Sequence, residues 1–237
     1  MRSFKTFFHK NARYEICCKQ DKYQLVIEEI IKQRQIIENY IRIHKEFQHS
    51  FVPIELKTKT ESIIQRMQKA SELTGIGPMA GVAGAIAQAA AEKIMSHDTN
   101  EIIINNGGDI YLVSPKPVII GLYAGKKADL NKLALEVMPD QMPLAICSSS
   151  GKMGHSTSLG DCDLATVIAK DAALADAAAT LAANLVRKAE DINKVLEKTN
   201  KIPGISGIII IKENNIGLIG NLPRLIKHEN PDLSKKI

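Results

Sequence analysis

Residues 145–184 read AICSSSGKMGHSTSLGDCDLATVIAKDAALADAAATLAAN, and this stretch holds the features that decide the fold. A run of small hydroxyl residues ends at a glycine and is followed by a second segment rich in glycine and serine. Residues 164–169 are then apolar and β-prone, which indicates a buried strand. An alanine-rich run opens at Asp171, a residue type favoured as a helix N-cap, so a helix is predicted directly after the strand.

The predicted helix carries Asp176 and Thr180, which are four positions apart and therefore lie on one helical face. A carboxylate and a hydroxyl at this spacing provide two hard oxygen ligands for one cation. An aspartate in an alanine-rich helix can also simply face solvent. Almost all of its neighbours are apolar here, however, and burying an unpaired carboxylate among them is unfavourable, which favours a metal ligand.

Two loops rich in glycine and serine lie beside the predicted strand and helix. The first is the turn of Ser148, Ser149, Ser150 and Gly151, and the second, residues 154–160, carries His155. Such loops expose backbone N–H groups that can bind a phosphate. His155 could contact that phosphate or act as an acid or base, or it could be a surface residue of the loop without a catalytic role.

A second stretch, GIGPMAGVAGAIAQAAAEKIM from Gly75, is glycine-rich at its start and alanine-rich after it. It predicts a helix that ends near Ser96. Glycines such as Gly81 would let this helix pack closely against a neighbour, or would present N–H groups to an anion at the helix N-terminus. The spacing differs from the dinucleotide-binding fingerprint after a strand, so a Rossmann site is not expected.

The motif Asn105-Asn106-Gly107-Gly108-Asp109 connects two short predicted strands, at residues 101–105 and 110–113. Asn-Gly favours a tight hairpin turn, which would by itself explain the motif. Two glycines also let a ligand approach the backbone while the carboxylate that follows them points toward it. Both interpretations are compatible with the residues.

The other elements come in blocks rather than in strict strand–helix alternation, which indicates an α+β fold with helices packed on a largely antiparallel sheet. Extended segments are predicted at residues 4–8, 14–19, 23–27, 117–122, 205–212 and 216–219. Helices are predicted at residues 28–48, 60–73, 129–135 and 191–198. We expect one domain, with an N-terminal hairpin and helix in residues 1–56, a ligand-binding core in residues 57–222 and a frayed tail in residues 223–237.

Composition narrows the classes of function. The formal net charge is +5, and without a dense basic run interleaved with aromatics we expect an anionic small ligand rather than nucleic acid. The four cysteines form no C-x-x-C pair, which favours reduced thiols over a zinc site. The chain shows neither a signal-peptide core nor an apolar run of membrane-spanning length, so a cytoplasmic protein without a membrane partner is expected. Alanine- and glycine-rich helices also pack well between subunits, so we expect a homo-oligomer.

Three segments taken together resemble the ApbE flavin-transferase superfamily. They are GPMAGVAGAIAQ, EIIINNGGDIYL, and SSSG followed by DLATVIAKDAALADAAATLAAN. Their order and separations match that family's helix, its Asn-x-Gly-Gly-Asp strand end and its closing Ala-Asp-Ala-x-Ala-Thr helix. The resemblance covers residues 75–185 and is greatest with a short cytosolic branch, the UPF0280 family.

This resemblance implies a T-fold-like α+β sandwich that binds FAD and a divalent metal such as Mg²⁺. Members of the superfamily cleave the FAD pyrophosphate and transfer FMN to a Thr or Ser of a target protein. Asp176 and Thr180 match the family's metal ligands and, with His155, are the candidates for catalysis. Candidates for contacts with the nucleotide are Asn105, Gly107, Gly108, Asp109, Gly81 and the turn at residues 148–151.

The chain departs from the family pattern in two places. Met79-Ala80-Gly81 stands where the transferases have a Lys-Gly pair. The segment GKMGHSTSLGDCD replaces a His-containing segment that leads to a prolyl-threonyl-glycyl turn. The resemblance therefore predicts either a Mg²⁺-dependent FMN transferase or a non-catalytic protein that binds a flavin or another anionic metabolite on the same fold.

Overall fold

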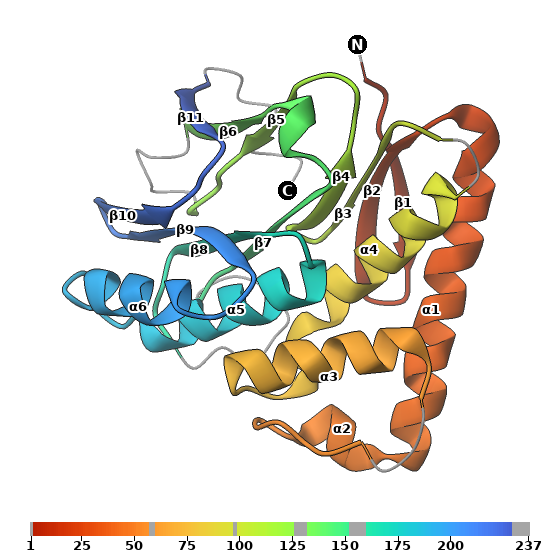
Figure 1. Cartoon of the computed structure of the whole chain (residues 1–237), viewed down its shortest axis with the longest axis horizontal. Helices are drawn as coiled ribbons and strands as arrows, with labels where there is room; N and C mark the ends of the chain where they lie inside the picture. The colour runs from red at the N-terminus through yellow and green to blue at the C-terminus, as the bar shows by residue number, and fades with distance from the viewer. Residues whose placement is uncertain (1, 57–59, 97–98, 126–131, 152–159, 229–237) are drawn as a thin grey trace.

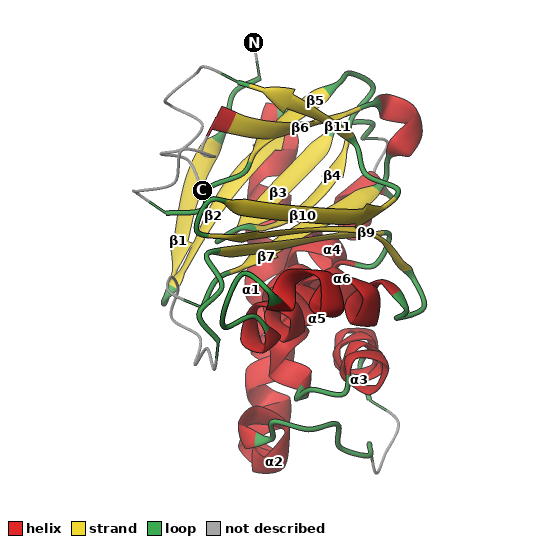
Figure 2. Cartoon of the chain, turned by 90° about the vertical axis from the view of Figure 1, so that its left-hand side faces the viewer, coloured by secondary structure: helices red, strands yellow, loops and turns green. Residues whose placement is uncertain are grey.

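The computed structural model describes all residues except 1, 57–59, 97–98, 126–131, 152–159 and 229–237. An eight-stranded antiparallel sheet, in the order β1-β2-β3-β4-β7-β8-β9-β10, forms its centre (Figure 1). Its strands are Lys5–His9 (β1), Ala12–Cys18 (β2), Ile102–Asn106 (β3), Asp109–Val113 (β4), Leu144–Ser149 (β7), Leu164–Ala169 (β8), Ile205–Lys212 (β9) and Asn215–Gly220 (β10). Helices cover one face of the sheet and a smaller sheet covers the other (Figure 2). This is the α+β sandwich predicted from the sequence.

The N-terminal segment forms the predicted hairpin of β1 and β2, followed by a helix that begins earlier than predicted. The extended segment predicted at residues 23–27 is wrong, because α1 (Tyr23–Ile43) already includes these residues. Val26 and Ile30 are four positions apart and both are buried. The helical period therefore starts here, and packing outweighs the β-propensity of the apolar residues. A short helix, α2 (Lys45–His49), follows.

Two alanine-rich helices lie directly on the sheet. They are α4 (Val82–Met95), on β3 and β4, and α5 (Ala172–Leu185), on β7 and β8. As predicted, α5 is capped by Asp171, whose carboxylate accepts the N–H of Leu174 at 2.9 Å. The helix α6 (Asp191–Asn200) covers β9 and β10, while α1 and α3 (Ser62–Thr74) pack on α4 and α5. Small side chains let these layers approach one another closely.

The second sheet has the order β11-β6-β5, with strands Val118–Gly121 (β5), Leu133–Val137 (β6) and Arg224–Lys227 (β11). The prediction of a helix at residues 129–135 is wrong from Leu133 onward, where β6 begins. Residues 129–131 of that prediction lie outside the described residues. Leu135 and Val137 alternate with polar or smaller residues and are buried between the two sheets, so the period is two and not 3.6. The frayed tail predicted at residues 223–237 is also wrong at its start, because β11 pairs with β6.

The large sheet joins the two ends of the chain. The N-terminal hairpin forms one edge and the β9–β10 hairpin forms the other. One apolar core lies between this sheet and the helices, and a second lies between the two sheets. Because strands from both halves of the chain share one sheet, we propose that the chain is a single domain.

Among the described residues, no single helix has the length and apolar character to cross a membrane. The helix α3 and the segment Pro78–Met95 meet those two criteria only as a pair, with a bend of 112° between them. Both contribute side chains to the core beneath the large sheet.

Candidate functional site

A row of polar side chains crosses the helix-covered face of the large sheet, which is otherwise lined by apolar residues. Tyr14, Asn106, Asp109 and Cys147 are lateral partners on β2, β3, β4 and β7. Lateral partners in an antiparallel sheet point to the same face. Asn106 and Asp109 are only 7% and 8% exposed. The fold thus assembles one buried polar row from four separate strands.

The Asp176 carboxylate reaches this region from helix α5. Its Oδ2 accepts the N–H of Gly84 at 2.9 Å, and the residue is 7% exposed. Gly84 is the third residue of α4, so the positive end of that helix dipole is directed at the carboxylate. A Cβ at Gly84 would lie 2.1 Å from the carbonyl oxygen of Ala172. Only glycine therefore lets the two helices meet backbone to backbone at this point.

The glycine-rich start of α4 consequently serves close packing. A Cβ at Gly81 would lie 2.6 Å from the carbonyl oxygen of Ala173. The N–H of Gly84, which could otherwise bind an external anion, is used by the carboxylate of Asp176. These contacts support the close-packing interpretation of the stretch, and a role of Gly81 in ligand binding stays a prediction.

Asp109 and Asp176 form a pair of interacting, buried carboxyl groups. Burial raises the pKa of Asp176 to about 7, although hydrogen bonds from the start of α4 act to lower it. Burial raises the pKa of Asp109 well above its usual value, and the nearby charge of Asp176 raises it further, whereas the Cys147 thiol and the Ser148 N–H lower it. Among the residues that the structure describes, the buried Oδ1 atom of Asp109 has no hydrogen-bond partner. Burial and the repulsion of like charges therefore oppose ionisation of both groups at once, and a bound cation would favour it.

The residues present fit a hard divalent cation. The two carboxylates and the hydroxyl of Thr180, on the same face of α5 as Asp176, supply only oxygen ligands. Across the described part of the chain, no group of three or more His, Cys, Asp or Glu residues could hold a metal. Structural zinc sites are built from such ligand groups, whereas Mg²⁺ needs one or two carboxylates and completes its shell with water and phosphate oxygens.

The residues before Asp109 shape the turn that carries it. Gly107 and Gly108 have φ angles of 68° and 111°, in the region that glycine adopts readily. The Oδ1 of Asn105 accepts the N–H of Gly108 at 2.8 Å. The lateral partner of Asn105 is Ile110, which lies in the core between the two sheets, so Asn105 and Asp109 are on opposite faces. The hairpin turn is confirmed, and direct contacts of these residues with a nucleotide stay a prediction.

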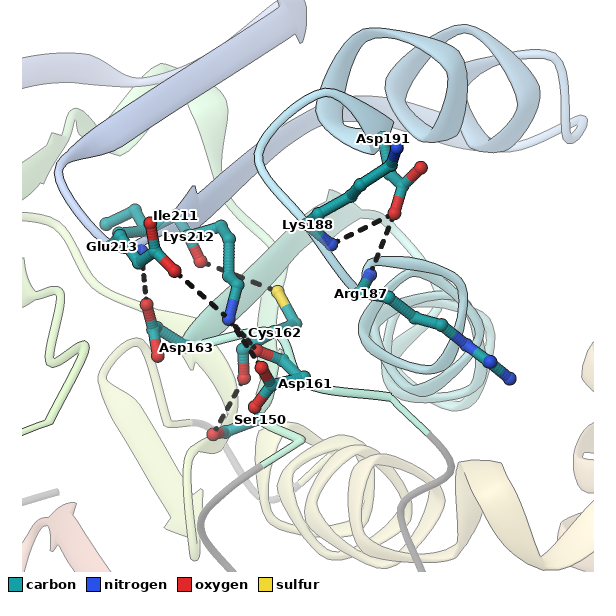
Figure 3. Close-up of polar contacts among 10 residues, drawn as sticks. All are labelled: Ser150, Asp161, Cys162, Asp163, Arg187, Lys188, Asp191, Ile211, Lys212 and Glu213. Atoms are coloured by element: carbon teal, nitrogen blue, oxygen red, sulfur yellow. Dashed lines mark hydrogen bonds and ion pairs between the residues drawn. The ribbon is translucent and has the colours of Figure 1, made fainter.

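The turn predicted to bind phosphate is held by the protein itself. The hydroxyl of Ser148 lies 2.9 Å from that of Thr166. The hydroxyl of Ser150 and the N–H of Gly151 both donate to the carbonyl oxygen of Cys162, at 3.3 Å and 2.8 Å. Figure 3 shows Ser150 pointing at this carbonyl. These groups therefore support the shape of the turn.

Two members of the predicted site remain. Ser149 follows Cys147 by two positions on β7, so it lies on the same face of the sheet as Asp109. It is the residue of the turn that the fold places on the side of the carboxyl pair. His155 lies outside the described residues.

The segment that supplies the Cys162 carbonyl is anchored by a buried cation (Figure 3). The Nζ of Lys212 donates to the carbonyl oxygen of Asp161 at 2.9 Å and to its Oδ2 at 2.7 Å. The backbone N–H of Glu213 donates to the carboxylate of Asp163. These contacts tie the end of β9 to the chain just before β8.

Sequence reasoning missed the contributions of Tyr14 and Asn106, and it treated Cys147 and Cys162 only as two of the four reduced thiols. Both cysteines are free thiols, and their sulfurs lie 3.5 Å from different carbonyl oxygens, those of Ala172 and Ile211 respectively. One signal was available in the sequence. A two-residue Gly-Gly turn makes the residues on either side of it lateral partners, which places Asn106 beside the aspartate.

Comparisons with known proteins agree with this architecture. A family model described as "AbpE bacteria" matches residues 14–214. A UPF0280 protein from Archaeoglobus fulgidus is 39% identical over 239 residues, covering 98% of this chain and 97% of the relative. A UPF0280 protein from Methanococcus aeolicus is 37% identical over 212 residues, covering 87% of this chain and 86% of the relative.

Two solved structures share the fold. The flavin transferase ApbE from Vibrio cholerae superposes with a TM-score of 0.59 at 12% identity, covering 93% of this chain and 97% of the other. The ApbE protein from Thermotoga maritima superposes with a TM-score of 0.59 at 14% identity, covering 100% of both chains. The superpositions establish a common fold. At identities this low, the chemistry has to be argued from the site itself.

Proposed function

We propose that this chain, which belongs to the UPF0280 family, binds FAD together with Mg²⁺ at the Asp109–Asp176 pair and cleaves the FAD pyrophosphate, transferring FMN to a hydroxyl acceptor. The ApbE fold supports a flavin as the ligand, because the Vibrio cholerae protein with the same architecture is a flavin transferase. The nature of the acceptor is part of the proposal.

The observation that carries the proposal is the buried carboxyl pair, which no cationic side chain of the described residues balances. Asp109 has a buried oxygen without a partner, and the charge of Asp176 opposes its ionisation. A divalent cation removes this repulsion and supplies the missing partner. When bound, Mg²⁺ would neutralise the non-bridging oxygens of a pyrophosphate.

The chain's own groups have defined parts in this scheme. Asp109, Asp176 and Thr180 would hold the cation. The N–H of Gly84 would keep the Asp176 carboxylate oriented by the hydrogen bond already present. Ser149, on the same face as Asp109, would lie toward the ligand. The burial of both carboxyl groups excludes water and strengthens their interaction with a cation.

A second function, binding without turnover, is favoured by one specific feature. The 3₁₀ turn before α4, Pro78–Gly81, contains Met79 and Ala80 and has no cationic side chain. A lysine there would stabilise charge on a phosphoryl group during transfer, and Met79 does not. This function predicts that the protein keeps FAD intact.

Thermal melts with FAD, FMN, ATP or buffer, each with and without Mg²⁺, test the shared part of both functions. We expect a rise in Tm with FAD that requires Mg²⁺ and is absent in Asp176→Asn. The absence of any shift in the wild-type protein would refute flavin binding. Chromatography of the FAD solution then separates the two functions, because release of FMN or AMP occurs only with turnover.

A further inference from the structure

The start of helix α4 is held from two sides. On one side, the Nδ2 of Asn106 donates to the carbonyl oxygen of Ala83 at 3.2 Å. On the other side, the N–H of Gly84 donates to the Asp176 carboxylate at 2.9 Å. Ala83 and Gly84 are consecutive, so one peptide unit connects Asn106 to Asp176.

The hydrogen bond from Asn106 is not needed to satisfy the backbone carbonyl groups of helix α4. Ala83 is the second residue of α4, and a helical carbonyl at that position accepts the N–H of the residue four positions on. The asparagine therefore uses the second lone pair of a carbonyl that the helix already satisfies. Its effect is to fix where the helix starts relative to the sheet.

Asn106 also sits beside the other carboxyl group. It is the lateral partner of Asp109 on the adjoining strand, across the Gly-Gly turn. Its lateral partner on the other side is Tyr14, whose buried phenol comes near both Asn106 and Arg34 of α1. Asn106 is thus adjacent to Asp109 in the sheet and linked to Asp176 through one peptide unit of α4.

We propose that Asn106 is a positioning residue that sets the separation of Asp109 and Asp176 through its bond to Ala83. The inference rests on the proposed function, in which that pair binds Mg²⁺. Asn106 holds one carboxylate through the hairpin and the other through the first turn of α4. Loss of its donor lets the helix start move away from the sheet, and Asp176 moves with Gly84.

The experiment is a Mg²⁺ titration of the full chain in the presence of FAD, with the shift in Tm as the measured signal. Asn106→Leu keeps the branched shape of the side chain and removes the donor. We expect the Mg²⁺ concentration at half-maximal shift to rise by about tenfold, the size typical for groups that orient metal ligands. Asn106→Ser, which keeps a shorter donor, should give an intermediate value and guards against a leucine variant that does not fold.

The matched control is Thr74→Val, which removes a buried hydrogen bond to the carbonyl of Ala70 within helix α3 and leaves the hydrogen bonds of Asn106 and Gly84 in place. It should lower the Tm without ligand and leave the Mg²⁺ midpoint within about twofold of the wild type. Asn106 variants that lower the Tm but keep the wild-type midpoint would overturn the inference while leaving the proposed function standing. A wild-type protein that does not respond to Mg²⁺ would overturn both.

Discussion

Two of the places at which the described residues bury charged groups are balanced differently. Lys212 is 2% exposed, and its ammonium group is paired with Asp161 at 2.7 Å. Asp109 and Asp176 are 8% and 7% exposed, and each carries the same sign of charge as its neighbour. The first place is complete within the fold, whereas the second has no positive partner among the described residues.

The difference shows that burial alone does not mark a functional site. A buried ion is unfavourable by several kcal/mol unless a counterion and hydrogen bonds compensate it. Lys212 has both and contributes to the architecture around β9. The carboxyl pair has hydrogen bonds but no counterion within the described part of the chain, so an external cation would find its ligands already in place.

The largest effect on stability is expected from breaking the ion pair between Lys212 and Asp161. Asp161→Ala should lower the free energy of unfolding by about 2–4 kcal/mol. The buried ammonium of Lys212 would then keep only a backbone carbonyl and the Glu213 carboxylate at 3.8 Å. Urea denaturation monitored by circular dichroism measures the change.

The matched variant at the same place is Lys212→Met, which substitutes an apolar side chain of similar length. The Asp161 side chain is 55% exposed and stays in contact with water, so this variant should lose less stability than Asp161→Ala. An equal or larger loss would mean that packing of the lysine stem, and not charge balance, stabilises this region.

At the carboxyl pair, a substitution should increase the free energy of unfolding instead of lowering it. Asp176→Asn should raise the free energy of unfolding of metal-free protein by about 1–3 kcal/mol at pH 8, because it removes a carboxylate whose ionisation is opposed by burial. The new amide oxygen can still accept the N–H of Gly84. Denaturation in EDTA tests this, and a loss of stability would instead identify Asp176 as a simple cap for α4.

The stability gained by Asp176→Asn should also depend on pH. Asp176 has an ordinary pKa of 3.8 and a folded value of about 7. A carboxyl group whose pKa is raised by folding contributes most below its ordinary value, and that contribution is lost as the pH rises through the folded value. Metal-free wild type should therefore lose stability relative to Asp176→Asn between about pH 4 and pH 8. Parallel curves for the two proteins would contradict the assignment, and Mg²⁺ should restore the wild type at pH 8.

The smallest effect on stability is expected at Thr180. Thr180→Val keeps the shape of a partly exposed side chain, so the free energy of unfolding should change by less than about 0.5 kcal/mol. The Mg²⁺ midpoint in the presence of FAD should nevertheless rise, because a hydroxyl ligand is lost. An unchanged midpoint would remove Thr180 from the proposed ligands.

Much of the candidate site could be predicted because it depends on local chemistry. Asp171 caps α5 as its residue type suggests, and the helix then carries Asp176 inward. The two glycines before Asp109 specify a tight turn from their own conformational freedom. By contrast, β6 and β11 are short strands stabilised by pairing within the small sheet, and segments this short carry too few residues for a local pattern to specify a strand.

The amino-acid sequence by itself determined the α+β class, the main helices, the Gly-Gly hairpin and the resemblance to the ApbE superfamily. These follow from periodicity, capping and turn residues, which act over a few neighbours. Only the tertiary structure decided that Asp109 and Asp176 influence each other's ionisation, that Asn106 connects them, and that Lys212 is neutralised by Asp161. Charge balance in a core depends on which distant side chains share a low-dielectric space, and strand register and helix packing set that arrangement.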